Sequence, residues 1–269
     1  MLLKVIACEI AFREFCYCAA RTRNLIDLEF LTQGHHDAPC QGREQIQRRI
    51  DAVPAGRYDA IVLGYGLCGQ ILSGLSTTHT RLVVPRAHDC ITLFLGSKER
   101  YQELFAGNPG TYYFTSGWLE CGQRRVASLR EGNQMFMPAH SGAGLREAYE
   151  QWVQKYGEER ANYLREVLGQ WTSYYNRGVL IDYEFTRPLN CREQVQKICA
   201  ERGWEYGEVA GDLGLFQRLL DGEWNESEVL TVRPGDQINA KFDDGIIEAL
   251  GVKKTGRCDA GAPSPSQTR

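Results

Sequence analysis

The chain has 269 residues, of which 43% are hydrophobic and 24% are charged, and its formal net charge is -3 at pH 7. This length suits one large domain or two small ones and is enough to bury a core without disulfides. The weak net charge, the scattered Lys and Arg residues and the lack of an apolar run near the roughly 20 residues of a membrane span exclude nucleic acid and membranes as expected partners.

Over the first 122 residues, short apolar runs alternate with helical patterns. The stretch YDAIVLGYG, residues 58–66, is typical of a buried strand, and REQIQRRIDAV, residues 43–53, has apolar residues at helical spacing. Parallel strands need a crossover connection, which is usually a helix. The alternation therefore predicts a mostly parallel, Rossmann-like α/β sheet. Its expected buried centre contains Val5, Ile6, Ile61, Val62, Leu63, Val83 and Val84.

The rest of the chain changes character twice. Residues 143–176 are charged and carry aromatic residues at helical intervals, and a second strand–helix alternation begins at residue 178. The predicted domains are a Rossmann-like lobe (1–122), a helical segment (123–177), a second α/β lobe (178–250) and a disordered tail (251–269). Packing between lobes is the simpler interpretation of the aromatic helix face, and a lid over the strand ends is the functional one. That face carries Trp152, Tyr156, Tyr163 and Trp171.

The start of the chain bears on the compartment in which its ten cysteines reside. The apolar stretch before Cys8 is a few residues long and is interrupted by Lys4, whereas an export signal has an apolar core of about 7 to 15 residues. We therefore expect a cytoplasmic location, where thiols are packing residues, catalytic groups or metal ligands more often than disulfides.

Three cysteines lie where predicted strands end. Cys8 ends the first strand, Cys68 follows the third in GYGLCG, and Cys90 follows the fourth in PRAHDC. The common strand order 2-1-3-4 makes these strands neighbours about 4.8 Å apart, with their carboxyl ends at one edge. Each thiol taken alone is more simply explained as packing. Together they predict a shared thiolate site for an iron–sulfur cluster or zinc.

Other residues are candidates to complete or tune this site. His88 lies two residues before Cys90, and Cys121 ends a strand-like segment, so both are candidate metal ligands. The alternative for PRAHDC is a polar loop in which Asp89 caps the next helix and His88 faces water. The chain has no C-x-x-C pair, so spacing does not identify the metal. Rim candidates are His35, His36, Asp37 and Cys40, and the cysteines expected to pack are Cys16, Cys18, Cys191 and Cys199.

A metal-free interpretation also fits the glycine turn. Backbone N–H groups at helix N-termini bind anions, so a small molecule or cofactor is the alternative ligand. A helix after the turn would also favour the thiolate of Cys68 through its dipole. The lack of a full G-x-G-x-x-G with an acidic residue about 20 positions later counts against a dinucleotide. The candidate cofactor-binding residues are Gly64, Gly66, Gly69 and Arg86.

Several motifs together resemble those of a known family. GYGLCG, PRAHDC followed by LFLGSKERY, TYYFTSGW and VRPGDQI are similar to motifs of an uncharacterised prokaryotic family defined as a domain of unknown function, over most of the chain up to about Asp244. Members are often encoded near corrinoid-dependent methyltransferases. The resemblance implies an enzyme or helper in anaerobic one-carbon metabolism, with a small molecule or a corrinoid-system protein as partner.

Overall fold

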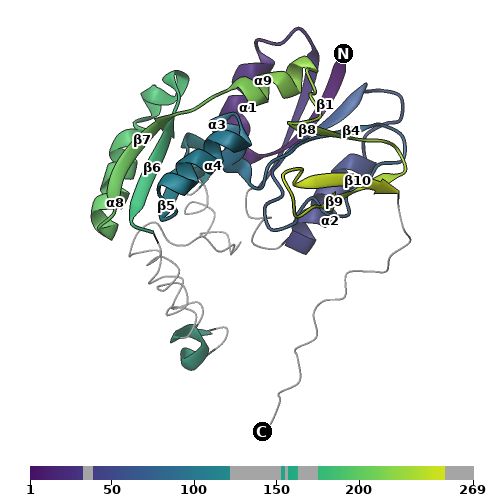
Figure 1. Cartoon of the computed structure of the whole chain (residues 1–269). Helices are drawn as coiled ribbons and strands as arrows, with labels where there is room; N and C mark the ends of the chain where they lie inside the picture. The colour runs from purple at the N-terminus through teal and green to yellow at the C-terminus, as the bar shows by residue number, and fades with distance from the viewer. Residues whose placement is uncertain (33–38, 122–152, 155–156, 163–174, 252–269) are drawn as a thin grey trace.

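The computed structural model describes residues 1–32, 39–121, 153–154, 157–162 and 175–251, and its main sheet has five strands (Figure 1). The strand order is β2-β1-β3-β4-β8, in which the first four strands are parallel and β8 is antiparallel to β4. The chain therefore has the predicted mostly parallel, Rossmann-like α/β fold. The strands are β1 (Leu2–Cys8), β2 (Leu25–Leu31), β3 (Ala60–Gly64), β4 (Leu82–Pro85) and β8 (Val229–Val232).

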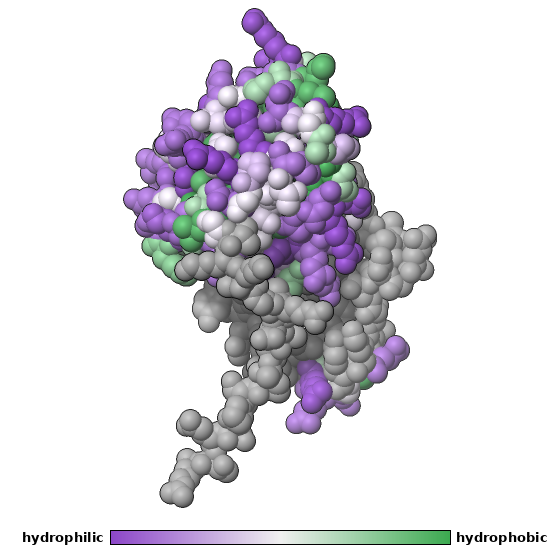
Figure 2. Space-filling model, turned by 90° about the vertical axis from the view of Figure 1, so that its right-hand side faces the viewer, coloured by the Kyte–Doolittle hydropathy of each residue, from purple (hydrophilic) through white to green (hydrophobic). Residues whose placement is uncertain are grey.

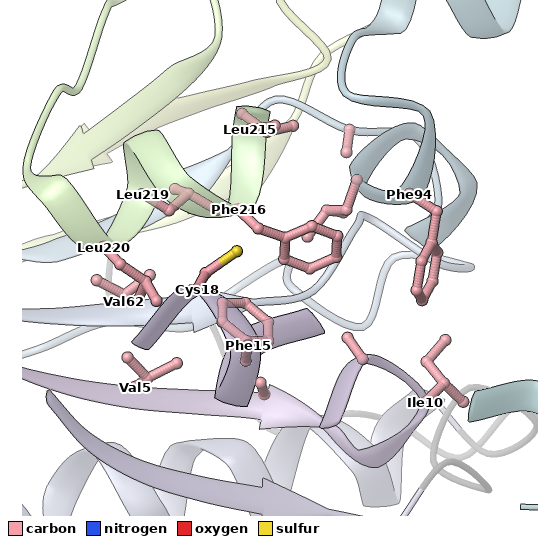
Figure 3. Close-up of a cluster of buried hydrophobic side chains, with 14 of the residues drawn as sticks. Val5, Ile10, Phe15, Cys18, Val62, Phe94, Leu215, Phe216, Leu219 and Leu220 are labelled. Atoms are coloured by element: carbon pink, nitrogen blue, oxygen red, sulfur yellow. The ribbon is translucent and has the colours of Figure 1, made fainter. Parts of the chain in front are cut away.

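Helices cover both faces of the main sheet. One face packs against α1 (Phe12–Ala19) and α9 (Gly214–Asp221), and Figure 3 shows Phe15 and Phe216 from these helices facing each other with Cys18 beside them. The two rings meet edge to face with their centroids 5.0 Å apart. The other face packs against α2 (Pro39–Asp51). All seven residues predicted for the sheet centre are fully buried, so that prediction is confirmed.

Two smaller sheets complete the described fold. β5 (Thr111–Phe114), β6 (Arg177–Asp182) and β7 (Glu205–Ala210) form a parallel sheet that packs against α8 (Cys191–Arg202). β9 (Asp236–Ala240) and β10 (Ile247–Gly251) form an antiparallel hairpin whose apolar residues join the core on the α2 side of the main sheet. Strand pairing thus gives one large sheet and two small ones.

Two short helices tie the three-stranded sheet to the main sheet. Asp89 caps α3 (Cys90–Leu95) by accepting a hydrogen bond from Ile91 N–H at 3.0 Å, and Ser97 caps α4 (Lys98–Gly107) through Arg100 N–H at 3.1 Å. The hydroxyl of Tyr183, which follows β6, donates to the carbonyl of Phe94 in α3 at 2.7 Å. The end of β6 is therefore held beside α3, the helix that follows β4. The chain also forms the 3-10 helices η1 (Glu9–Ala11) and η4 (Glu184–Leu189).

The sheets do not follow the predicted lobe boundaries. β5 lies within residues 1–122 but pairs with β6, and β8 lies within residues 178–250 but pairs with β4. Long-range pairing decides sheet membership, and local periodicity does not reveal it. The predicted aromatic face at Trp152, Tyr156, Tyr163 and Trp171, and residues 252–269 of the predicted tail, lie outside the described residues.

The surface is mixed in polarity on the side where β9 and β10 lie. Figure 2 shows mainly hydrophilic residues there, with hydrophobic residues scattered among them. Among the described helices, none combines the length and the apolar character needed to cross a bilayer. The apolar faces of the described elements are instead used in the three core clusters between sheets and helices.

Candidate thiolate site

The structure brings the three predicted strands together as neighbours. β1 lies beside β3, and β3 lies beside β4, all in parallel. Cys8 is the last residue of β1, Cys68 lies four residues after β3, and Cys90 begins α3 after β4. All three are partly exposed. They therefore lie at the carboxyl-end edge of the sheet, where doubly wound proteins bind their ligands.

Cys68 and Cys90 are in direct contact through a hydrogen bond between their side chains. The loops that carry them are joined by two main-chain hydrogen bonds, from Leu67 N–H to the Ala87 carbonyl at 2.8 Å and from Cys68 N–H to the His88 carbonyl at 2.9 Å. A Cβ atom on Gly66 would lie 2.5 Å from the main chain of Asp89. The glycine therefore permits the close approach of the loops that pairs the two thiols.

Cys8 links this pair to a fourth thiol. Its side chain interacts electrostatically with both Cys68 and Cys121. Cys121 was a candidate ligand on the condition that its segment joined the sheet beside β4, but β8 occupies that position. Residues 116–121 are helical instead. Cys121 is buried with 1% of its surface exposed, so its thiol belongs to the inner side of the site.

The helical residues 116–121 are held against the segment that follows Cys8. A Cβ atom on Gly117 would lie 1.7 Å from the Ile10 carbonyl oxygen, so only glycine permits this approach. The Arg13 guanidinium donates two hydrogen bonds from Nε to the Glu120 carboxylate, at 3.0 and 3.1 Å. This ion pair and the glycine contact explain how Cys121 reaches the environment of Cys8.

The loop after β3 has an unusual backbone at Cys68. Three consecutive residues there have positive φ angles: 38° at Cys68, 65° at Gly69 and 70° at Gln70. Residues other than glycine seldom adopt this left-handed region. Residues 68–74 form turns, so the predicted helix after the glycine turn is wrong, and with it a helix dipole acting on Cys68. The Arg43 side chain donates to the Gln70 carbonyl at 3.1 Å. The packed loops and this contact from α2 support a strained conformation, a feature that occurs often at functional sites.

The environment of the thiols favours their protonated form. The hydrogen bond with Cys68 contributes most to raising the pKa of Cys90, followed by burial and by the repulsion that a Cys90 thiolate would meet from ionised Cys68, Asp89 or Cys8. Burial is also the main cause that raises the pKa of Cys8, and Cys68 and Cys121 add to it. Reactive cysteines have lowered pKa values, so these two thiols do not have the electrostatics of a metal-free nucleophile.

Asp89 and His88 contribute to the site mainly through the structure of their loop. Burial raises the pKa of the Asp89 carboxyl, which the Tyr101 hydroxyl opposes by donating a hydrogen bond at 3.0 Å. His88 is exposed, and its carbonyl accepts from Cys68 N–H. Asp89 therefore caps α3, as the alternative interpretation of PRAHDC predicted. This cap holds Cys90, the first residue of α3, in place.

The predicted cofactor-binding residues have contacts within the chain. The Arg86 guanidinium donates to the carbonyls of Glu226 and Gly245, both at 2.7 Å, and to that of Ile247. A Cβ atom on Gly64 would lie 2.5 Å from both the Ala7 Cβ and the Phe15 ring, and one on Gly69 would lie 3.7 Å from Pro39. Arg86 therefore anchors the hairpin, and Gly64 packs under α1.

The remaining cysteines and rim candidates are placed as follows. Cys18, Cys191 and Cys199 are buried in the cores, as predicted, and Cys40 is exposed in α2. His35, His36 and Asp37 lie outside the described residues. Nine cysteines fall within the described part of the chain, and none of these forms a disulfide. In the same part, no three His, Cys, Asp or Glu side chains are already arranged to hold a single metal ion.

Tyr65 is a site residue that the sequence reasoning missed. It directly follows β3, and its ring packs in the same core cluster as Ile61 and Leu63. Charges on Cys8 and Cys68 both act on its hydroxyl, whose pKa is raised mainly by burial. The alternation of Ile61, Leu63 and Tyr65 along the strand is the signal that could have placed this ring on that face.

Comparison with known proteins identifies a family for this chain. The family model described as "Protein of unknown function (DUF1638)" matches residues 30–220. This range includes Cys68, Cys90 and Cys121, whereas Cys8 precedes it. No curated protein and no solved structure matches the chain. Because the family model covers most of its length, the chain belongs to the DUF1638 family of proteins of unknown function.

Proposed function

We propose that this protein is a thiolate-ligated metal protein that holds an iron–sulfur cluster or zinc through Cys8, Cys68 and Cys90, with Cys121 as a fourth ligand. The observation that carries the proposal is the hydrogen-bonded pair of Cys68 and Cys90 together with the electrostatic influence of neighbouring thiols on Cys8. Cys68 and Cys90 are hydrogen-bonded, and Cys8 interacts with both Cys68 and Cys121. Four thiols from separate segments at one sheet edge are a donor set suited to soft metals.

The raised pKa values support a role for a cation. Burial and mutual repulsion make it costly for Cys8 and Cys90 to ionise as free thiols. A bound metal removes this cost because it supplies positive charge to the thiolates, and binding releases their protons. These thiols are thus poor free nucleophiles but suit a metal ion, and their affinity for the metal is expected to rise with pH.

Between the two centres, we favour the iron–sulfur cluster because its ligands do not have to meet at a single ion. Zinc–sulfur bonds of about 2.3 Å require the sulfurs to lie roughly 4 Å apart around one ion. No three candidate side chains among the described residues have a single-ion arrangement. A cluster of several irons spreads its thiolate ligands over a wider area, which suits thiols that come from a loop, a strand end and two helices.

The bound centre would determine the chemistry of the protein. An iron–sulfur cluster would supply an electron-transfer site, and zinc would supply a Lewis acid or a structural tie. In either case the protein's own contribution is the partly exposed edge formed by Cys8, Cys68 and Cys90. The role in corrinoid-dependent one-carbon metabolism, with a small molecule or a corrinoid-system protein as partner, stays a prediction. The metal-free, anion-binding function has less support, because the Arg86 guanidinium already donates to main-chain carbonyls and the N–H groups of Leu67 and Cys68 donate to the Ala87 and His88 carbonyls.

The proposal predicts that protein purified without oxygen contains stoichiometric metal. Iron, zinc and acid-labile sulfide should be measured per chain, together with the visible absorption spectrum. Iron with sulfide and broad visible absorption identifies a cluster, and zinc without visible absorption identifies the other centre. Protein that contains neither metal, and that takes up neither after anaerobic incubation with iron and sulfide or with zinc, would contradict the proposed function.

A further inference from the structure

The hydroxyl of Tyr65 is buried without a hydrogen-bond partner in the described part of the structure. The residue is 5% exposed. A buried hydroxyl without a partner costs free energy, so most such groups in folded proteins are paired with protein or water. An unpaired one next to a candidate ligand site therefore points to a partner that binds there.

Tyr65 belongs to a core cluster against which both Cys8 and Cys68 pack. The residue lies between the end of β3 and Cys68, and both Cys8 and Cys68 act electrostatically on it. Glu29, which also acts on Tyr65, has its own partners, because it pairs with Lys4 at 3.0 Å and with Arg49 at 3.2 Å. The unused donor of Tyr65 therefore lies in the cluster that packs against two of the proposed ligands, Cys8 and Cys68.

We propose that the Tyr65 hydroxyl donates a hydrogen bond to a sulfur of the bound centre, either a thiolate of Cys8 or Cys68 or an inorganic sulfide. This inference rests on the proposed function. Tyr65 is then a positioning residue, since it acts on the metal through the sulfur. Hydrogen bonds to ligand sulfurs draw electron density from them and change the potential and reactivity of the centre.

The test replaces Tyr65 by phenylalanine, which keeps the ring and removes only the hydroxyl. Tyr58→Phe is the matched control, because Tyr58 precedes the same strand, packs in the same core cluster and gives its hydroxyl to Asp27. Wild type and both variants are purified without oxygen, and their metal and sulfide contents and circular dichroism are compared. An iron–sulfur centre is then titrated for its midpoint potential, and a zinc centre is assayed for the rate of thiolate alkylation by iodoacetamide.

We expect Tyr65→Phe to keep the fold and to have a lower midpoint potential, or a faster alkylation rate, than wild type and Tyr58→Phe. Loss of metal from Tyr65→Phe with unchanged circular dichroism also supports the contact, since the ring packing is retained. An unchanged potential or rate at normal metal content would overturn the role of Tyr65 alone, as would an equal shift in Tyr58→Phe. A wild-type protein without metal would overturn the proposed function and this inference together.

Discussion

Replacing Cys68 by serine is expected to remove most of the bound metal from anaerobically purified protein while the α/β sheet stays folded. Cys68 contacts Cys90 directly and lies in a loop at the sheet edge, outside the fully buried centre. Removing a residue that hydrogen-bonds to a metal ligand typically lowers metal affinity roughly 10–100-fold, and removing a ligand itself lowers it further. Metal per chain, measured by mass spectrometry, should fall by at least about tenfold, and Cys8→Ser and Cys90→Ser should behave alike.

Cys199→Ser provides the control for this series. Cys199 is buried in α8, where its thiol donates a hydrogen bond to the Gly178 carbonyl at 3.8 Å. Its substitution removes a cysteine and leaves the thiolate site untouched, so metal content should stay at the wild-type level. Full metal in Cys68→Ser, or the same loss in Cys199→Ser, would show that the metal is not held by the proposed thiols.

Glu14→Gln is expected to remove a large pH dependence of stability. The Glu14 side chain in α1 is fully buried, and neither carboxyl oxygen has a hydrogen-bond partner in the described structure. Burial is the main cause that raises its pKa from 4.5 to about 8, with Glu120 adding to the rise and Arg13 opposing it. In the folded protein this carboxyl therefore stays protonated over a pH range in which it ionises in the unfolded chain.

The direction of the pH dependence of stability follows from the number of protons that the folded and unfolded states bind. Between pH 4.5 and about 8 the folded protein binds more protons at Glu14 than the unfolded chain does, so stability falls as the pH rises through this range. The full difference corresponds to a loss of up to roughly 5 kcal/mol. Glutamine does not titrate, so Glu14→Gln should gain stability relative to wild type at pH 8 and differ little at pH 5.

Urea unfolding at pH 5, 6, 7 and 8 measures this difference. Glu44→Gln is the control, since Glu44 is exposed on α2 and its side chain meets Arg48 only in a long contact of 3.8 Å. The control should follow the wild-type pH dependence. A Glu14→Gln variant whose stability follows wild type in parallel from pH 5 to pH 8 would mean that the carboxyl ionises in the folded protein without penalty.

The sequence allowed the main sheet to be predicted because its signals are local. The apolar runs at Val62 and Val83 mark buried strands, and the helices α1 and α2 between the first three strands are crossovers typical of parallel pairing. β4 is also parallel to β3, although turns connect these two strands. The antiparallel β8 and the pairing of β5 with β6 were not predictable in this way, because each depends on a partner more than 60 residues away. Strand pairing therefore crosses the predicted lobe boundaries, and local patterns did not reveal this.

The candidate site shows the same division. Cys8, Cys68 and Cys90 were predictable as a group because the carboxyl ends of adjacent parallel strands share one edge. Cys121 reaches Cys8 by another route, through the Arg13–Glu120 ion pair and the packing of residues 116–121, which strand logic does not describe. The turn after Cys68 replaced an expected helix, since a glycine turn after a strand fits either continuation.

X-ray absorption at the iron or zinc K-edge of anaerobically purified protein tests the thiolate centre most directly. The account predicts a first coordination shell dominated by sulfur at about 2.3 Å, with a further iron–iron shell if the centre is a cluster. Cys68→Ser should lose this signal and Cys199→Ser should keep it. A first shell made up of nitrogen and oxygen alone, or protein without metal at either edge, would contradict the account.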